Sequence, residues 1–158
     1  MTVKRRKITL KGVKPVDLMQ TKYEYYWLYG AFDVLIGESF YCEYNRMNKI
    51  NCQHFIDQLS LDYPDTINII LMDNSKTHFI DKFPDNIKFI NNEPYSPELN
   101  PAESVWREFK DKMGWKIFEE IDKLKEHISK TINELTNEKI ISLIQYPYII
   151  EACHALNI

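Results

Sequence analysis

The sequence predicts a mixed α/β fold whose carboxyl-terminal end is helical. Three observations support this class. Two aromatic-rich segments flank a turn within residues 23–44, an uninterrupted apolar segment fills residues 67–72, and apolar residues recur at helical spacing after residue 100. The first two patterns are typical of strands and the third of amphipathic helices. With 158 residues, the chain is long enough for one domain with its own core.

A hairpin is predicted near the start of the chain. Residues 23–32, YEYYWLYGAF, are rich in the aromatic side chains that favour strands. Residues 33–37 indicate a turn, and residues 38–44 then alternate in the manner of a second strand. Residues 6–10 could form a further short strand.

One helix and two strands are predicted in the middle of the chain. We expect Asn51 to cap a helix that Pro64 ends. The apolar residues 67–72 do not alternate, which predicts a strand buried on both faces in the middle of a layered sheet. Residues 87–90 predict another short strand.

Helical segments follow to the end of the chain. Asn100 is expected to cap the first, with Pro101 at its first position, where proline is tolerated. A second is predicted over residues 118–135, where apolar residues form a stripe at helical spacing. A third spans residues 136–144 with a threonine cap at its start, and the tail beyond Pro147 is helical again.

Charge is distributed unevenly along the chain. A net charge of −3 argues against a free-standing nucleic-acid binder, which is usually basic. The start of the chain is nevertheless basic, and its cationic residues are Lys4, Arg5, Arg6, Lys7, Lys11 and Lys14. Two interpretations remain open: a solvated arm, or an arm that contacts the phosphates of DNA.

The cysteines and the apolar segments bear on the cellular compartment. Cys42, Cys52 and Cys153 are odd in number and match no CxxC metal spacing, so we expect reduced thiols. No apolar segment of signal-peptide length follows the basic start, and none approaches the roughly 18 apolar residues of a membrane span. We therefore expect a soluble, cytoplasmic protein with no membrane partner.

Two carboxylates each have a structural and a chemical interpretation. Asp73 directly follows the strand predicted at residues 67–72, where Asp-Asn is also good turn chemistry. Glu103 follows Asn100 at the spacing of a capping box, in which the glutamate bonds back to the amide of the cap. Two convergent carboxylates would suit Mg²⁺ or Mn²⁺, which prefer hard oxygen ligands. Their spacing alone does not choose between these interpretations.

Two longer motifs contain these carboxylates. IILMDNSKTH, followed by PYSPELNPAESVWREFK, closely resembles the DDE-type transposases of bacterial insertion sequences in the mariner superfamily. The resemblance covers nearly the whole chain, and it assigns the family's second catalytic aspartate to Asp73 and its third acid to Glu103. The other matching motif positions are Asn74, His78, Tyr95, Ser96, Pro97, Asn100 and Pro101.

The resemblance implies one DDE endonuclease domain over residues 1–158, with an RNase H-like mixed sheet flanked by helices. It also implies two Mg²⁺ or Mn²⁺ ions held by Asp73 and Glu103 together with a further aspartate. Such a domain would hydrolyse a phosphodiester and join the freed 3′-hydroxyl to target DNA. Its partners would be the ends of the DNA element and the target, and it could form a homodimer or associate with a full-length relative. Another RNase H-like nuclease, such as a ribonuclease or a resolvase, fits the second motif less well.

The chain departs from the family pattern. Asp73 and Glu103 are 103 − 73 = 30 residues apart, which is a few residues fewer than that pattern leads us to expect. The first catalytic aspartate has no counterpart: no residue before Asp17 is acidic, and neither Asp17 nor Asp33 ends a predicted core strand. The family's helix-turn-helix DNA-binding domain is absent too.

The missing first strand has a structural consequence. In an RNase H-like sheet this strand would pair with the hairpin on one side and with residues 67–72 on the other. Without it, two edges would be unpaired, and the protein would be only marginally stable unless residues 6–10 or a second chain filled the gap. The alternative function is therefore a catalytically inactive transposase remnant, at most a binding or oligomerisation module.

Overall fold

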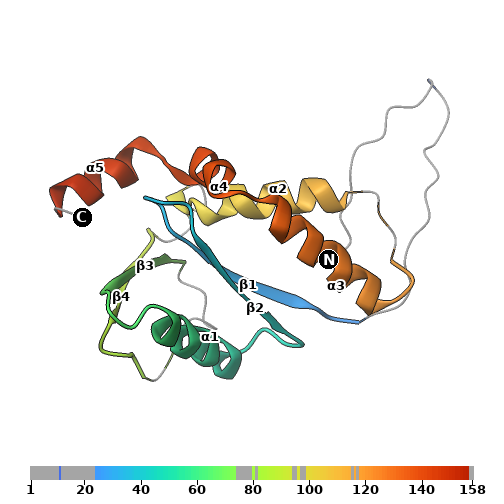
Figure 1. Ribbon diagram of the computed structural model, residues 1–158, viewed down its shortest axis with the longest axis horizontal. Coiled ribbons are helices and arrows are strands. Elements are labelled where there is room, and N and C mark those ends of the chain that lie inside the picture. Colours follow the sequence, from blue (N-terminus) through green and yellow to red (C-terminus); the bar gives the residue numbers. More distant parts are fainter. Residues whose placement is uncertain are drawn as a thin grey trace.

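Four strands and five helices make up the part of the chain that the computed structural model describes, which comprises residues 11, 24–73, 80, 82–93, 96, 99–114, 116 and 118–156. In chain order they are β1 (Trp27–Phe32), β2 (Ser39–Tyr44), α1 (Lys49–Asp62), β3 (Asn68–Met72), β4 (Ile87–Asn91), α2 (Ala102–Met113), α3 (Ile121–Glu134), α4 (Asn137–Ile144) and α5 (Pro147–Ala155) (Figure 1). The predicted mixed α/β class with a helical carboxyl-terminal end is confirmed, and it is consistent with an RNase H-like fold.

The hairpin of β1 and β2 forms as predicted. The two strands pair antiparallel, with Trp27 opposite Tyr44 at the open end. In the turn, the Asp33 carboxylate accepts hydrogen bonds from the backbone N–H groups of Leu35 at 2.7 Å and Ile36 at 2.9 Å. Gly37 in the same turn has a left-handed φ of 73°. β1 begins at Trp27 rather than at residue 23, because β2 offers no partner beyond Tyr44.

Helix α1 begins earlier than predicted. Its N-cap is Asn48, whose Oδ1 accepts the backbone N–H of Asn51 at 2.8 Å. The expected cap at Asn51 is therefore wrong. Asn51 lies inside the first turn, and its side-chain amide donates to the Arg46 carbonyl at 2.8 Å. The helix ends at Asp62, before Pro64, as predicted.

Strands β3 and β4 form a separate parallel pair. Their register sets Met72 opposite Asn91, so both strands end at the same edge. One face of the pair packs on α1, whereas the other is open: Ile67 is 70% exposed, Ile69 43% and Ile90 48%. The prediction that this segment is buried on both faces is therefore wrong. An apolar segment is buried on both faces only where a second layer covers it, and the described residues do not cover this face.

The carboxyl-terminal helices follow the predicted order. Helix α3 begins at Ile121, slightly later than predicted. Thr136 caps α4 as predicted, since its Oγ1 accepts the backbone N–H of Lys139 at 3.3 Å. Helix α5 begins at Pro147, where a proline needs no N–H partner. None of the described helices is long and apolar enough to cross a membrane.

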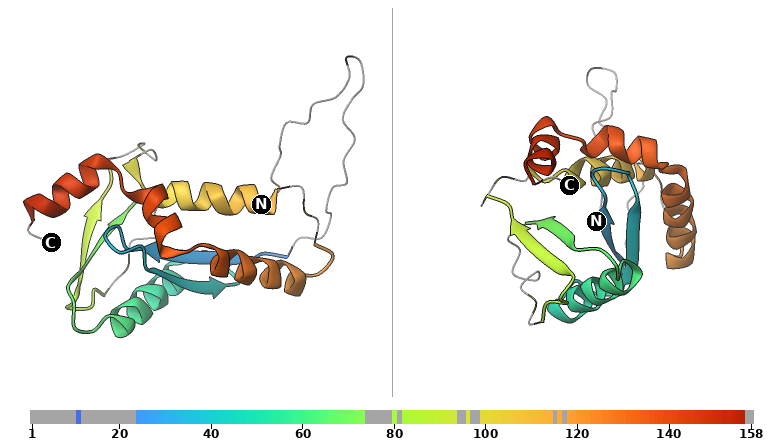
Figure 2. Two further views of the ribbon diagram at one scale, coloured as in Figure 1. Left: turned by 45° about the horizontal axis from the view of Figure 1, so that its top comes forward. Right: turned by 60° about the vertical axis from the view of Figure 1, so that its left-hand side comes forward.

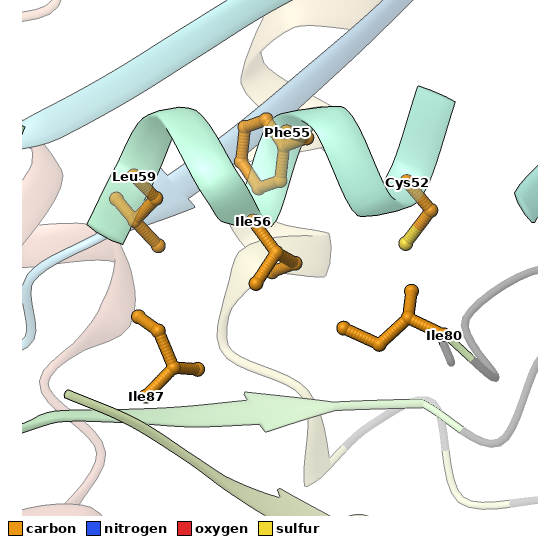
Figure 3. Close-up of a cluster of buried hydrophobic side chains, with 6 residues drawn as sticks. All are labelled: Cys52, Phe55, Ile56, Leu59, Ile80 and Ile87. Atoms are coloured by element: carbon orange, nitrogen blue, oxygen red, sulfur yellow. The ribbon is translucent and has the colours of Figure 1, made fainter. Parts of the chain in front are cut away.

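Two hydrophobic clusters lie on opposite faces of the hairpin, because alternate residues of a strand point to opposite sides. The first fills the space between the hairpin, α1 and the β3–β4 pair, and its buried members are Cys52, Phe55, Ile56, Leu59, Ile80 and Ile87 (Figure 3). The second lies between the hairpin and helices α2 to α4, and its buried members are Val105, Phe109, Ile128, Leu135, Ile140 and Ile144. The hairpin is thus the middle layer of the fold.

The four strands form two separate two-stranded sheets, and β1 of one sheet lies next to β3 of the other (Figure 2). The right-hand view of Figure 2 shows the order β4, β3, β1, β2 across the molecule. Within the described residues, ladders of backbone hydrogen bonds join only β1 to β2 and β3 to β4. The edges of β1 and β3 that face each other therefore have no strand partner in the described part of the chain. The further strand considered for residues 6–10 lies outside it.

Candidate active site

Asp73 directly follows β3 at the edge where both strands of the parallel pair end. Asp73 is exposed, but the backbone just before it is held by the hydrogen bonds between β3 and β4. The Asn92 N–H, on the neighbouring strand, donates to the Met72 carbonyl at 2.9 Å and so extends the pairing up to Asp73. The carboxylate is thus carried by an ordered strand end and is accessible from solvent.

The end of β3 also lies near the first turn of α1. Burial raises the pKa of the Cys52 thiol, and the negative charge of Asp73 raises it further. Asp73 is therefore within electrostatic reach of a side chain in the first turn of α1. Sequence reasoning did not connect these segments, because no local pattern relates residues so far apart in the chain.

Glu103 lies half-buried in the first turn of α2. The preceding Pro101 is buried and already has helical dihedral angles, φ −58° and ψ −31°. The N-cap residue of α2 is Pro101, one residue after the predicted cap, but the Asn100 side chain still bonds to the helix start, because its Oδ1 accepts the Ala102 N–H at 3.1 Å. The Asn100 carbonyl accepts the Glu103 N–H, also at 3.1 Å.

The reciprocal half of the predicted capping box is not formed. Among the described residues, the Glu103 carboxylate has no hydrogen-bond partner, and the Asn100 side chain bonds to Ala102 instead of Glu103. The start of α2 is therefore capped without the glutamate side chain. Within the part of the chain that the structure describes, the cap therefore does not occupy the Glu103 carboxylate.

Of the remaining predicted site residues, Ser96 and Lys11 lie within the described part of the chain and the others do not. Ser96 is half-buried, and its carbonyl accepts the Leu99 N–H at 3.1 Å, which helps to shape the approach to α2. Lys11 is exposed. The others lie outside the described residues: Lys4, Arg5, Arg6, Lys7, Lys14, Asn74, His78, Tyr95 and Pro97.

Two tyrosines that sequence reasoning did not select contact the chain on either side of Glu103. The Tyr146 hydroxyl and the Ser104 Oγ are 2.6 Å apart and share a hydrogen bond. The Tyr148 hydroxyl donates to the Leu99 carbonyl at 2.6 Å. Their position in the helical tail gave no sequence signal of this contact.

The donor atoms fit a hard divalent cation in type, but not in number. Carboxylate oxygens are the ligands that Mg²⁺ and Mn²⁺ prefer. Among the described residues, however, no group of three or more His, Cys, Asp or Glu side chains could hold a metal ion. Asp73 and Glu103 would therefore supply only part of a coordination shell, and water, substrate oxygens or a side chain outside the described residues would complete it.

A family model described as DDE superfamily endonuclease matches residues 1–125. This span includes both carboxylates and all four described strands. The chain belongs to the DDE superfamily endonuclease family. Helices α4 and α5 lie beyond the matched residues.

One relative of this chain is an uncharacterized protein of Sinorhizobium fredii (strain NBRC 101917 / NGR234), y4pE/y4sA. The two are 34% identical over 80 residues, which are 48% of this chain and 59% of the relative. The chain thus spans less than two thirds of that protein. No solved structure matches the chain.

Proposed function

We propose that this chain is the catalytic domain of a DDE-type transposase of bacterial insertion sequences, from the mariner superfamily. Asp73 and Glu103 are the second and third acids of its metal site, and Mg²⁺ or Mn²⁺ is the cofactor. The observation that supports the proposal best is the position of Glu103 and the absence of its carboxylate, among the described residues, from the helix cap. Glu103 sits in the family's second motif at the start of α2, and within the described residues its carboxylate is not used by the cap.

The roles of the two carboxylates follow from their chemistry. A pair of divalent ions, when bound, would activate a water molecule and stabilise the leaving oxygen of a phosphodiester. Asp73, at a strand end, and Glu103, at a helix start, are carried on ordered elements, and a catalytic site needs such rigid support. Their negative charge would hold cations that in turn face the phosphates of DNA.

The substrate is DNA, at the element ends and at the target. The basic residues at the start of the chain would contact phosphates without reading the sequence. Those residues are Lys4, Arg5, Arg6, Lys7, Lys11 and Lys14.

A second candidate function is a catalytically inactive remnant, at most a binding or oligomerisation module. It is favoured by the absence of a third acidic ligand among the described residues and by the two unjoined sheets. Removing one ligand from a two-metal site should cost several kcal/mol of transition-state stabilisation. The coding DNA upstream of Met1 distinguishes the two candidates, because an in-frame or frameshifted strand that ends in aspartate would restore the third ligand.

Plasmid nicking tests the proposal. A version of the protein that carries a strand ending in aspartate ahead of Met1 is expected to nick supercoiled DNA in Mn²⁺. Asp73→Asn or Glu103→Gln should slow this reaction about 100-fold or more, because each removes a charge from the metal site. Asp85→Asn, at an exposed turn before β4, is the matched control and should leave the rate unchanged. Nicking that is insensitive to both site substitutions would contradict the assignment. No nicking by the extended protein would favour the inactive remnant.

A further inference from the structure

Two hydroxyl groups anchor the start of α5 to the chain around the start of α2, one to its first turn and one to the segment just before it. Tyr146, the N-cap residue of α5, bonds to Ser104, the residue after Glu103, at 2.6 Å. Tyr148, in the first turn of α5, donates to the Leu99 carbonyl at 2.6 Å. The two bonds thus fall on opposite sides of Glu103 along the chain.

The two tyrosines are themselves firmly placed. Their rings pack against each other, with centroids 5.8 Å apart. Helix α4, which leads into them, is buried against α2 through Ile140 and Ile144, which are 0% and 1% exposed. The Tyr148 hydroxyl is protonated at neutral pH already at its ordinary pKa of 10, and burial raises that pKa further.

The turn that carries Glu103 needs such support. The side-chain cap of α2 is one hydrogen bond, from the Ala102 N–H to Asn100. The backbone bonds of Glu103 and Ser104 span three residues, to Asn100 and Pro101, as in a tight 3₁₀ turn. A helix start of this kind frays unless outside contacts hold it.

We infer that Tyr146 and Tyr148 are positioning residues, which fix the first turn of α2 and thereby aim the Glu103 carboxylate. Helix α5 lies beyond residues 1–125, the part of the chain that the family model matches. We call the two hydrogen bonds of Tyr146 and Tyr148 the tyrosine clamp. The inference rests on the proposed function of Glu103 as a metal ligand, although the clamp itself can be measured without metal.

The test uses Tyr146→Phe and Tyr148→Phe, which remove only the hydroxyl groups and keep the packed rings. Amide hydrogen exchange at Glu103 and Ser104, followed by NMR, should become on the order of three- to ten-fold faster in both variants, the effect of losing one hydrogen bond. Mn²⁺ affinity should fall by a similar factor while the melting temperature changes little. Ser104→Ala should reproduce the effect of Tyr146→Phe, whereas Ser104→Thr, which retains a hydroxyl, should restore the behaviour of the unmodified protein. Tyr25→Phe, at a residue that is 68% exposed, is the control.

The outcomes separate the clamp from the proposed function. Unchanged amide exchange in both tyrosine variants would overturn the inference, whatever the metal data show. Faster exchange with unchanged Mn²⁺ affinity would show that the clamp orders the turn without aiming Glu103, and it would overturn the positioning role. If the unmodified protein bound no Mn²⁺, the proposed function would fail, and with it the aiming of a metal ligand, while the exchange rates would still report whether the clamp exists.

Discussion

Replacing Gly37 with alanine is expected to lower the free energy of unfolding by about 2–4 kcal/mol. Two independent costs add at this residue. Its φ of 73° is left-handed, a conformation that costs a residue with a Cβ roughly 1–2 kcal/mol. A Cβ would also overlap the backbone of Asn137, against its carbonyl oxygen and 2.8 Å from its carbonyl carbon. That backbone begins α4 and cannot easily yield, because Thr136 caps the helix and Ile140 is fully buried.

The Gly37→Ala effect can be measured by urea unfolding, followed by far-ultraviolet circular dichroism. Gly114→Ala is the matched control. Its φ of −55° suits any residue, so the change should be within roughly 0.5 kcal/mol. A loss below about 0.5 kcal/mol for Gly37→Ala would contradict the close contact between the hairpin turn and the start of α4.

The purified monomer is expected to melt below about 45 °C, the lower end of the range for mesophilic domains. The physical reason is the pair of inner edges, on β1 and β3, which lack a strand partner among the described residues. Unpaired backbone and the exposed apolar side chains of Ile67, Ile69 and Ile90 both lower stability. Calorimetry of the monomer measures this directly, and a cooperative transition at high temperature would contradict it.

A strand added between the unpaired edges of β1 and β3 should raise the stability of the monomer. An apolar six-residue extension ahead of Met1, able to pair with both edges, is expected to raise the melting temperature by roughly 10 °C, corresponding to about 3 kcal/mol. The control is the same extension with a proline at its centre, which cannot complete the ladder. Equal melting temperatures for the two extensions would mean that the gap between the sheets does not accept a strand.

Local chemistry allowed most elements to be predicted. The hairpin, the end of α1 before Pro64, the Thr136 cap and the start of α5 at Pro147 all depend on residues within a few positions of one another. The start of α1 was missed because Asn48 and Asn51 are both suitable caps, one turn apart, and only the folded chain shows which side chain accepts the bond.

Local sequence patterns could not predict which strand faces are buried or which residues surround the candidate site. The apolar residues 67–72 form a strand as predicted, but their burial depends on layers that other segments must supply. Asp73 and Glu103 could be selected from their motifs. Their neighbours could not, since Cys52 on one side and Tyr146 on the other reach the site only through the fold.

Isothermal titration calorimetry with Mn²⁺ shows whether Asp73 and Glu103 form one divalent-cation site. The proteins to compare are the unmodified chain, Asp73→Ala, Glu103→Ala and the control Asp85→Ala. We expect binding in the micromolar to tens-of-micromolar range, roughly −6 to −8 kcal/mol, that is lost in both site variants and kept in the control. Absence of binding, or binding that survives both site substitutions, would contradict it and leave Glu103 as a residue of the helix start only.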